Sequence, residues 1–534
     1  MKGISKWLSV IVTVTTAATV LAACGDNGAE SGDSPSPSAT GQGGAAQAFD
    51  KKITVTMFHS GGFSPANPLP LNKEEDPLHQ MLDKSANIDL QITFVPNDQA
   101  KQKLNTMVAS GDVPDLIYMT DRAMAVQYYD QGIIADIDGV LKDYPALKSN
   151  YSNDVWDALT YKGKVLGTPG YELVQGIRGI WVRGDWLKKL NLKTPTTPDE
   201  LLEVMKAFTN NDPDGNGKND TYGYVMGVQK SGELGGLGID PLMLMYGVHP
   251  GGISVKDGKL VYATTDARMK EAIGFMNKMQ EAKVIDPDWM TITDNAGIEN
   301  KFYSGKVGIM VQDWRSMELS NQKKMKDVLG EVPDWVLIPP MKGPHGDQYS
   351  TTTNPQNNLW SISTKAAKDS EKVKRIMTML QYWFTDKEAY PYFAYGIKGV
   401  NWDMADGKVK INQENKANKE LQDKYRWMNN YANNRRANDA LYFNYTNEKT
   451  AEFQKLNQQY VKPLGVETFV TPDPSDAMWE DRKKFINESL LKFIAGKDSL
   501  NNWDNFLKTL DTKYAYPQYQ KYIEKNLKDQ GILK

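Results

Sequence analysis

The sequence predicts an α/β protein in which the first strands of a parallel sheet alternate with helices. Three apolar or alternating runs are typical of strands, at 52–58, 89–95 and 115–118. Apolar residues at helical spacing fill the intervals between these runs, over about 72–84 and 100–110. Strands that alternate with helices over short connections favour a parallel sheet with helices on its faces.

Two later stretches predict further helices of this fold. Thr197 and Glu200 form a capping box with Pro198 at the first helical position, and an apolar face follows them. In the C-terminal tail, apolar residues from Phe485 to Leu510 recur at the spacing of amphipathic helices.

The N-terminus has the pattern of a secretory signal. Two lysines precede the apolar stretch 7–20, which is shorter than the about 20 residues that span a membrane. The run LAAC at 21–24 has the form of a bacterial lipobox, and Cys24 is the only cysteine. We expect Cys24 to be lipidated after removal of residues 1–23, since its diacylglyceryl group supplies the two chains that stable anchoring needs. This predicts a cell-membrane anchor on the extracytoplasmic face; the alternative is a secreted protein with a free cysteine.

The anchor is followed by a predicted linker, so that residues 24–49 join Cys24 to the folded part. This segment is rich in Gly, Ser, Pro and Ala and has few residues to bury. Such composition is typical of flexible linkers.

Composition restricts the possible partners. The chain has 534 residues and a formal net charge of −3, and removing a signal with two lysines and no acids changes this to −5. Mild acidity argues against nucleic acid, which calls for a basic domain. A single cysteine allows no internal disulfide. The 13 Trp and 26 Tyr suit a large core, or aromatic surfaces that bind sugars.

Several segments resemble, in the same order, the motifs of one protein family. They are ASGDVPDLIY at 109–118, YKGKVLGTP at 161–169, IWVRGDW at 180–186, LKTPTTPDE at 192–200 and FYSGKVGIM at 302–310. As a set they resemble family 1 extracellular solute-binding proteins, the ligand-capturing lipoproteins of carbohydrate ABC importers. A later segment, 395–402, is similar to another family motif but has Lys398 in place of an acid.

The resemblance implies a periplasmic-binding-protein-like fold of type II, with two α/β lobes joined by a hinge and a ligand cleft between them. The first lobe would hold 50–165 plus 310–365, and the second 166–309 plus 366–534. A monomer of this kind would capture an oligosaccharide and deliver it to the permease subunits of an ABC transporter.

Signatures of catalysis are missing from the sequence. It contains no nucleophile elbow, no phosphate-binding glycine loop and no histidine metal motif. A glycosidase needs two carboxylates that flank a bond, and nothing singles out a pair among 66 acids. We therefore expect a binding protein and not an enzyme. The alternatives are a surface-tethered carbohydrate-active enzyme and a peptide-sensing or adhesive lipoprotein.

Oxygen ligands at alternate positions predict a structural Ca²⁺ site after the capped helix. The loop offers side-chain oxygens, a backbone carbonyl and a turn glycine at the positions of an EF-hand-type loop: Asp212, Asp214, Asn216, Asp220, the carbonyl of Lys218, and Gly217. Gly223 stands where an EF-hand has a bidentate glutamate. Calcium loops of this kind occur in alginate-binding members of the family, with an acid where Thr221 stands here, so the sixth ligand is in doubt. A polar turn without metal is the alternative.

Strand ends and crossover segments supply the candidate sugar-binding residues, because ligands of open α/β sheets bind at the carboxyl ends of strands. Aromatic faces and a few fixed polar groups are what a sugar site needs. The candidates are His59, Asp121, Tyr171, Glu172, Trp314, Arg315, Trp360 on a returning strand, and Tyr395 near the hinge. Trp360 could instead be core, and Arg315 could pair internally or favour a uronate.

Overall fold

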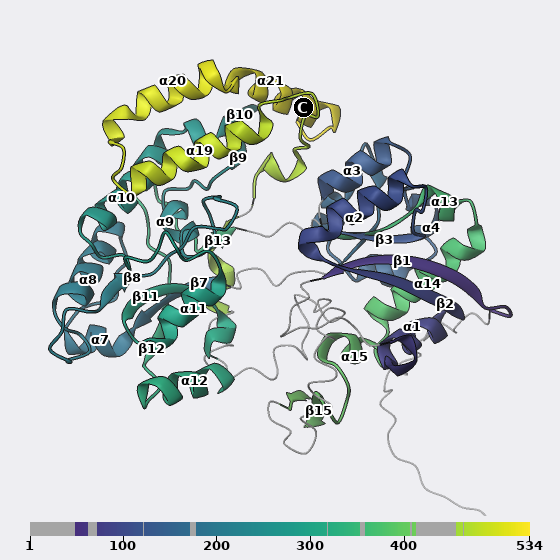
Figure 1. The fold of residues 1–534 in the computed structure, drawn as a ribbon, viewed down its shortest axis with the longest axis horizontal. Helices are drawn as coiled ribbons and strands as arrows, with labels where there is room; N and C mark the ends of the chain where they lie inside the picture. Colours follow the sequence, from purple (N-terminus) through teal and green to yellow (C-terminus); the bar gives the residue numbers. More distant parts are fainter. Residues whose placement is uncertain are drawn as a thin grey trace, which may run out of the picture. The chain divides into compact units, whose positions relative to one another are not determined.

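The computed structural model describes residues 49–61, 72–120, 122–170, 178–317, 319–352, 358–405, 408–412, 455–462 and 464–533 (Figure 1). The predicted signal peptide and almost all of the predicted linker lie outside these residues. Within them, no helix combines the length and apolar character that crossing a membrane requires. Two mixed sheets, each with its own helices, organise this part of the chain.

The first sheet has five strands in the order β2-β1-β3-β14-β6. β1 pairs in parallel with β2 and β3, whereas β14 runs antiparallel to β3 and β6. Their bounds are β1 (Ile53–Gly61), β2 (Ile88–Pro96), β3 (Leu116–Met119), β14 (Leu359–Ile362) and β6 (Thr168–Pro169). β1 to β3 confirm the predicted alternation of strands and helices.

Helices cover both faces of this sheet because successive strand residues point to opposite faces. Val55 and Met57 belong to one core and Phe58 to another. Figure 1 shows the helices of the two cores on opposite sides of the sheet: α1 (Pro77–Ser85) and α14 (Ser370–Thr385) on one, α2 (Asn97–Ala109) and α3 (Arg122–Asp130) on the other.

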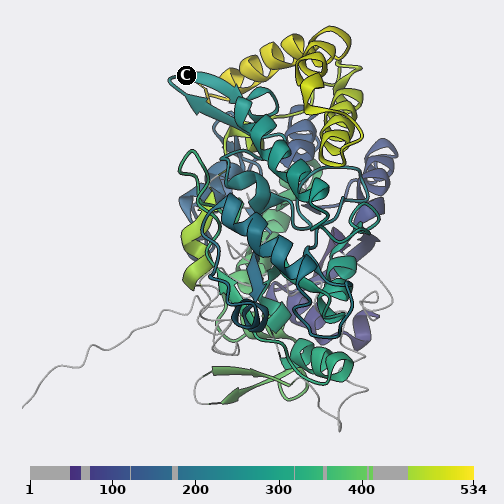
Figure 2. The ribbon, with the colours of Figure 1, turned by 90° about the vertical axis from the view of Figure 1, so that its left-hand side faces the viewer.

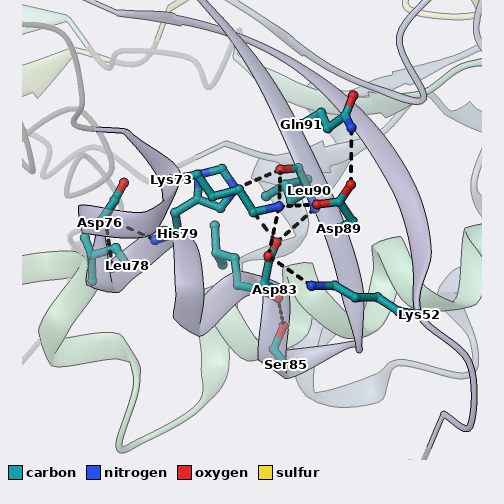
Figure 3. A network of polar contacts seen from close by, with 11 residues as sticks. Lys52, Lys73, Asp76, Leu78, His79, Asp83, Ser85, Asp89, Leu90 and Gln91 are labelled. Atoms are coloured by element: carbon teal, nitrogen blue, oxygen red, sulfur yellow. Dashed lines mark hydrogen bonds and ion pairs between the residues drawn. The ribbon is translucent and has the colours of Figure 1, made fainter.

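Polar contacts tie α1 to β2, which is an edge strand (Figure 3). Asp76 caps the helix, since its Oδ1 accepts the N–H groups of Leu78 and His79. The Nε2 of His79 lies 2.8 Å from the carbonyl oxygen of Leu90, and Asp83 Oδ1 accepts the N–H of Leu90 at 2.9 Å. The N–H and the carbonyl of Leu90 therefore both have hydrogen-bond partners, whereas the backbone groups of an unprotected edge strand have none.

The second sheet has four strands in the order β12-β7-β11-β8. β7 runs antiparallel to β11 and β12, and β11 runs parallel to β8. Their bounds are β12 (Trp335–Ile338), β7 (Arg178–Arg183), β11 (Val307–Asp313) and β8 (Tyr222–Tyr224).

Two cores also flank the second sheet. Ile180 and Ile309 lie in the largest core of the described residues, with α8 (Pro198–Asn210), α9 (Asp240–Leu244), α10 (Ala267–Glu281), α19 (Trp479–Ile494), α20 (Trp503–Lys513) and α21 (Tyr516–Asp529). Figures 1 and 2 show the last three grouped together. Of these, α19 and α20 lie in the predicted tail region from Phe485 to Leu510. Trp181 and Met310 lie in another core, with α11 (Asn295–Tyr303), α12 (Leu319–Leu329) and α15 (Tyr390–Tyr395).

The capping of α8 confirms the predicted start of that helix with one difference. Thr197 Oγ1 accepts the N–H of Glu200 at 3.3 Å. The return bond goes to the preceding residue, because Glu200 Oε2 accepts the N–H and the hydroxyl of Thr196 at 2.8 and 2.7 Å.

Shorter elements connect these parts. They are α4 (Asp138–Leu141), α5 (Pro145–Ser149), α6 (Asn153–Ala158), β4 (Thr160–Tyr161), β5 (Lys164–Val165), α7 (Gly184–Lys189), β9 (Ile253–Lys256), β10 (Lys259–Tyr262), β13 (Thr351–Thr352), α13 (Thr364–Ala367), β15 (Trp402–Ala405), β16 (Lys408–Ile411) and β17 (Val461–Lys462).

The strand pairings differ from the expected lobe ranges. β12 and the second half of β11 lie within 310–365, the range expected in the first lobe, but both strands pair with β7 of the second sheet. Conversely, α14 lies within 366–534 but packs on the first sheet through Ile376 and Leu380. Sheet membership depends on hydrogen bonds between distant segments, which apolar patterns do not specify.

Candidate functional site

The carboxyl ends of three strands of the first sheet meet at one edge. β1, β3 and β6 end there and antiparallel β14 begins there, since Leu359 is in register with Met119 on one side and Pro169 on the other. In open α/β sheets this edge is where ligands bind. Candidate Asp121 directly follows β3 and lies outside the described residues, as do Tyr171 and Glu172 after β6.

His59 and Trp360 meet behind this edge in an aromatic cluster with Tyr118 of β3. The ring centroids of His59 and Tyr118 lie 5.1 Å apart, those of Tyr118 and Trp360 4.7 Å, and those of His59 and Trp360 5.3 Å. His59 is 4% exposed and Trp360 is 2% exposed. Burial lowers the pKa of His59 to about 4, so its ring is neutral at physiological pH.

This burial corrects the nomination of His59 and Trp360 as open faces for a sugar. Both side chains pack beneath the edge and can support groups that reach a ligand. Tyr118, which sequence reasoning missed, belongs to the same cluster. A Cβ on Gly170 would lie 2.7 Å from Tyr118 Cε2, so the chain passes close over this ring just before Tyr171.

Tyr395 is also a core residue. It ends α15, is 6% exposed, and its ring centroid lies 6.2 Å from that of Trp402. The same short helix contributes Phe393 to the core of the first sheet and Tyr395 to a core of the second. The helix thus joins the two cores, and its aromatic side chains are used for packing.

The second sheet presents an edge of the same kind. β8, β11 and β12 end where antiparallel β7 begins, and Asp313, the last residue of β11, is in register with Arg178, the first of β7. The 3₁₀ helix Trp314–Met317 follows β11 directly. The backbone therefore places the candidates Trp314 and Arg315 at this edge.

Arg178 is a polar residue of this edge that sequence reasoning missed. Its Nη2 donates to Asn295 Oδ1 at 3.2 Å. The glycine-rich loop 232–238 lies beside it, and a Cβ on Gly236 would lie 3.7 Å from Arg178 Nη1 and 3.7 Å from Gln229 Nε2. The only sequence signal was position, since Arg178 directly precedes the motif at 180–186.

The predicted calcium loop brings three of its side chains to one point. The Nδ2 of Asn216 lies 2.8 Å from Asp214 Oδ2 and 3.1 Å from Asp220 Oδ1. Asp212 shapes the backbone, since its two carboxylate oxygens accept the N–H groups of Asn216 and Gly217 at 3.0 and 3.1 Å. Carboxylate, amide and carbonyl oxygens are the ligands that Ca²⁺ prefers, so the chemistry of this loop fits the ion.

The carboxylates of this loop attract a cation, and the amine of nearby Lys306 competes with a metal ion for one of their oxygens. Burial, together with the carboxylates of Asp212 and Asp220, raises the pKa of Asp214. A hydrogen bond from Lys306 Nζ, at 2.9 Å from Asp220 Oδ2, lowers the pKa of Asp220. Lys189 Nζ donates to the carbonyl of Pro213 at 2.9 Å. Among the residues that the structure describes, no three His, Cys, Asp or Glu side chains gather closely enough to hold a metal.

Comparison with known proteins identifies the family. The family model for bacterial extracellular solute-binding proteins matches residues 73–390. The chain belongs to this family. The match covers all four strands of the second sheet and every strand of the first sheet except β1.

Relatives of this solute-binding protein support the assignment. Lipoprotein LipO of Bacillus subtilis is 30% identical over 64% of this chain and 66% of its own length. The polygalacturonan/rhamnogalacturonan-binding protein YtcQ of the same organism is 26% identical over 83% of this chain and 86% of its own length.

Solved structures share the fold. An extracellular solute-binding protein from Bifidobacterium longum subsp. infantis covers 91% of this chain and 100% of its own, with a TM-score of 0.71 and 19% identity. Two others have descriptions that mention a calcium ion or an EF-hand. They are alginate-binding protein AlgQ2 without calcium ion (TM-score 0.65, 20% identity, 90% of this chain and 98% of that one) and an EF-hand mutant of Streptococcus pneumoniae FusA (0.63, 20%, 88% and 99%).

Proposed function

We propose that this protein is the substrate-binding component of an ABC importer, which captures an oligosaccharide and delivers it to permease subunits. The observation that carries the proposal is the match to the solute-binding family over 73–390. YtcQ is named for binding polygalacturonan and rhamnogalacturonan, and FusA is named as a fructooligosaccharide substrate-binding protein. The family consists of binding proteins, so the proposed action is capture without bond cleavage.

The ligand would contact the carboxyl edges of both sheets. Trp314 and Arg315 are proposed contacts from the second sheet, and Asp121, Tyr171 and Glu172 from the first. Aromatic faces stack on the apolar C–H faces of sugar rings, while charged and amide groups bond the hydroxyls. His59, Trp360 and Tyr395 would act from behind by holding the strand ends in place.

The proposed anchor is the lipidated Cys24, followed by a linker that lets a monomer reach the permease. The family is extracellular by description, and LipO is named a lipoprotein. Both agree with a protein held on the extracytoplasmic face of the cell membrane.

The proposed cofactor is one structural Ca²⁺ in the loop 212–220. Asp212, Asp214, Asn216, Asp220 and the carbonyl of Lys218 would hold it. The ion would neutralise the carboxylates that meet at Asn216. The loop directly precedes the start of β8, so the ion would stiffen the end of this sheet that is distant from the ligand edge.

A binding screen tests the proposed function. Thermal shift of the purified mature protein against neutral and acidic oligosaccharides, with short peptides as the contrast, should show stabilisation by a sugar, because a ligand of the folded state raises its stability. Calorimetry on the best sugar should give one site. Stabilisation by peptides alone, or by no oligosaccharide, would contradict the proposal.

A further inference from the structure

Arg178 differs from the other arginines whose side chains the structure describes. Arg183, Arg268, Arg375 and Arg482 each form an ion pair with a carboxylate. Arg122 donates to two backbone carbonyls and to Gln530, with donor–acceptor distances of 2.7 to 3.2 Å. Arg178 makes a single side-chain hydrogen bond within the described residues, to the neutral amide of Asn295.

Within the described residues, Arg178 lies near acids but forms no ion pair with them. Gln229 and Asn295 are neutral amides, and no carboxylate of the described residues lies within ion-pair distance of its guanidinium. Asp313 lies opposite Arg178 in the register of β11 and β7. Asp240 is another nearby acid, and its Oδ1 accepts a hydrogen bond from the N–H of Gly236 at 2.7 Å. Burial raises the pKa of Asp240, against the opposing effects of that N–H and of Arg178.

The position and partial burial of the Arg178 guanidinium suit it to bind a charged group of a ligand. Arg178 begins β7 at the edge where β11 ends, directly beside the backbone of Trp314. Its side chain is half-buried, and a charge there is screened less by salt than one in open solvent. A guanidinium with free N–H groups is suited to a carboxylate, which it binds through two parallel hydrogen bonds.

We propose that Arg178 binds a carboxylate of the ligand, so that the captured oligosaccharide is acidic and contains uronate residues. This inference rests on the proposed function and names the substrate class of that site. Gln229 and Asn295 would hold the guanidinium in position and offer hydrogen bonds to neighbouring hydroxyls.

Calorimetry with matched sugars tests the inference. The probes are uronate oligosaccharides built from galacturonate, mannuronate or glucuronate, each compared with its fully methyl-esterified form. The ester keeps the ring and removes the charge. The wild type should bind at least one acid more tightly than its ester, with an affinity that falls as salt is raised.

Substitution of Arg178 tests whether this residue causes the preference for the acid over its ester. Arg178→Gln should weaken binding of the acid by about 10- to 100-fold, the range for a hydrogen bond to a charged group, and change binding of the ester much less. Arg178→Lys should fall between, since it keeps the charge without the fork of donors. Lys206→Gln makes the same charge change on the exposed face of α8 and should leave both affinities unchanged.

The outcomes separate this inference from the proposed function. If the wild type binds neutral oligosaccharides such as kestose but prefers no acid to its ester, the substrate class is wrong and the importer function stands. An Arg178→Gln protein that keeps the wild-type preference for acid would overturn the role of Arg178. Failure to bind any oligosaccharide would contradict both.

Discussion

Trp314 is the single residue whose loss should weaken ligand binding most among the candidates at the second edge. The backbone places it directly after β11, and a centrally placed aromatic anchor dominates the energy of a binding site. Trp314→Ala should therefore cost about 2 kcal/mol or more of affinity, measured by calorimetry with the oligosaccharide that the screen identifies. Trp360→Phe is the contrast, because it alters a buried ring and should lower stability more than affinity. An unchanged dissociation constant for Trp314→Ala would remove this residue from the site.

Asp76 should make stability depend on pH. Its side chain is fully buried, its Oδ1 caps α1, and its Oδ2 makes no hydrogen bond within the described residues. Burial raises the pKa of Asp76 to about 7, well above that of an unfolded aspartate. The folded state therefore binds the proton more tightly, and the free energy of unfolding should fall as pH rises from about 4 to about 7.

Asp76→Asn isolates this effect, since asparagine keeps the cap and removes the charge. Its free energy of unfolding, relative to that of the wild type, should increase by about 1–4 kcal/mol between pH 4 and pH 7.5. Urea unfolding at several pH values measures the difference. Burial also lowers the pKa of His79, and the comparison of the two proteins largely cancels the contribution of this histidine. A difference that does not vary with pH would refute the assignment.

For single residues, the sequence predicted where a side chain lies along the chain better than whether it is exposed or buried. Trp314 and Arg315 follow a strand as predicted, because apolar runs mark where strands end. The burial of Trp360 was expected only as an alternative, and that of His59 was not expected, since it depends on rings from three strands that meet only in the fold. Arg178 was missed because its lack of an ion-pair partner among the described residues is a property of distant neighbours and not of local sequence.

Among the elements, the loop between α8 and β8 has side chains suited to bind a calcium ion. The carboxylates of Asp214 and Asp220 meet at Asn216, and burial, together with the neighbouring carboxylates, raises the pKa of Asp214. Calcium should raise the melting temperature of the wild type, because an ion that binds only the folded state stabilises it by mass action.

Asp214→Ala should abolish that response to calcium and to its removal by a chelator. Asp327→Ala, which removes an exposed acid paired with Lys323 on α12, should keep the wild-type response. Differential scanning calorimetry with and without chelator makes the comparison. Equal shifts in wild type and Asp214→Ala would exclude the loop as the calcium site.

Elements with local signals were predicted well. α8 begins at its capping box and β1 to β3 lie where the apolar runs are. The range 310–365 was expected in the first lobe, but β12 and the end of β11 pair in the second sheet, because strands of either sheet have the same apolar pattern. A returning strand such as β14 was assigned correctly through the family resemblance and not through periodicity.

For the whole molecule, the anchor decides where the binding protein works. Cys24 lies outside the described residues, and its lipidation rests on the lipobox. Expression of the full chain in a bacterial host should give a membrane-bound protein that carries diacylglyceryl at Cys24, detected by mass spectrometry. Cys24→Ser should remain unlipidated and uncleaved by the lipoprotein pathway; a lipidated variant would show the assignment to be wrong.

The central claim is that the whole protein binds an oligosaccharide without cleaving it. The most direct measurement is calorimetry of the mature protein with the best sugar of the screen, followed by mass analysis of the recovered ligand after prolonged incubation. The account predicts one sugar per protein, a reversible dissociation constant and an intact ligand. Shortened products that accumulate in the wild type would contradict it and indicate an enzyme.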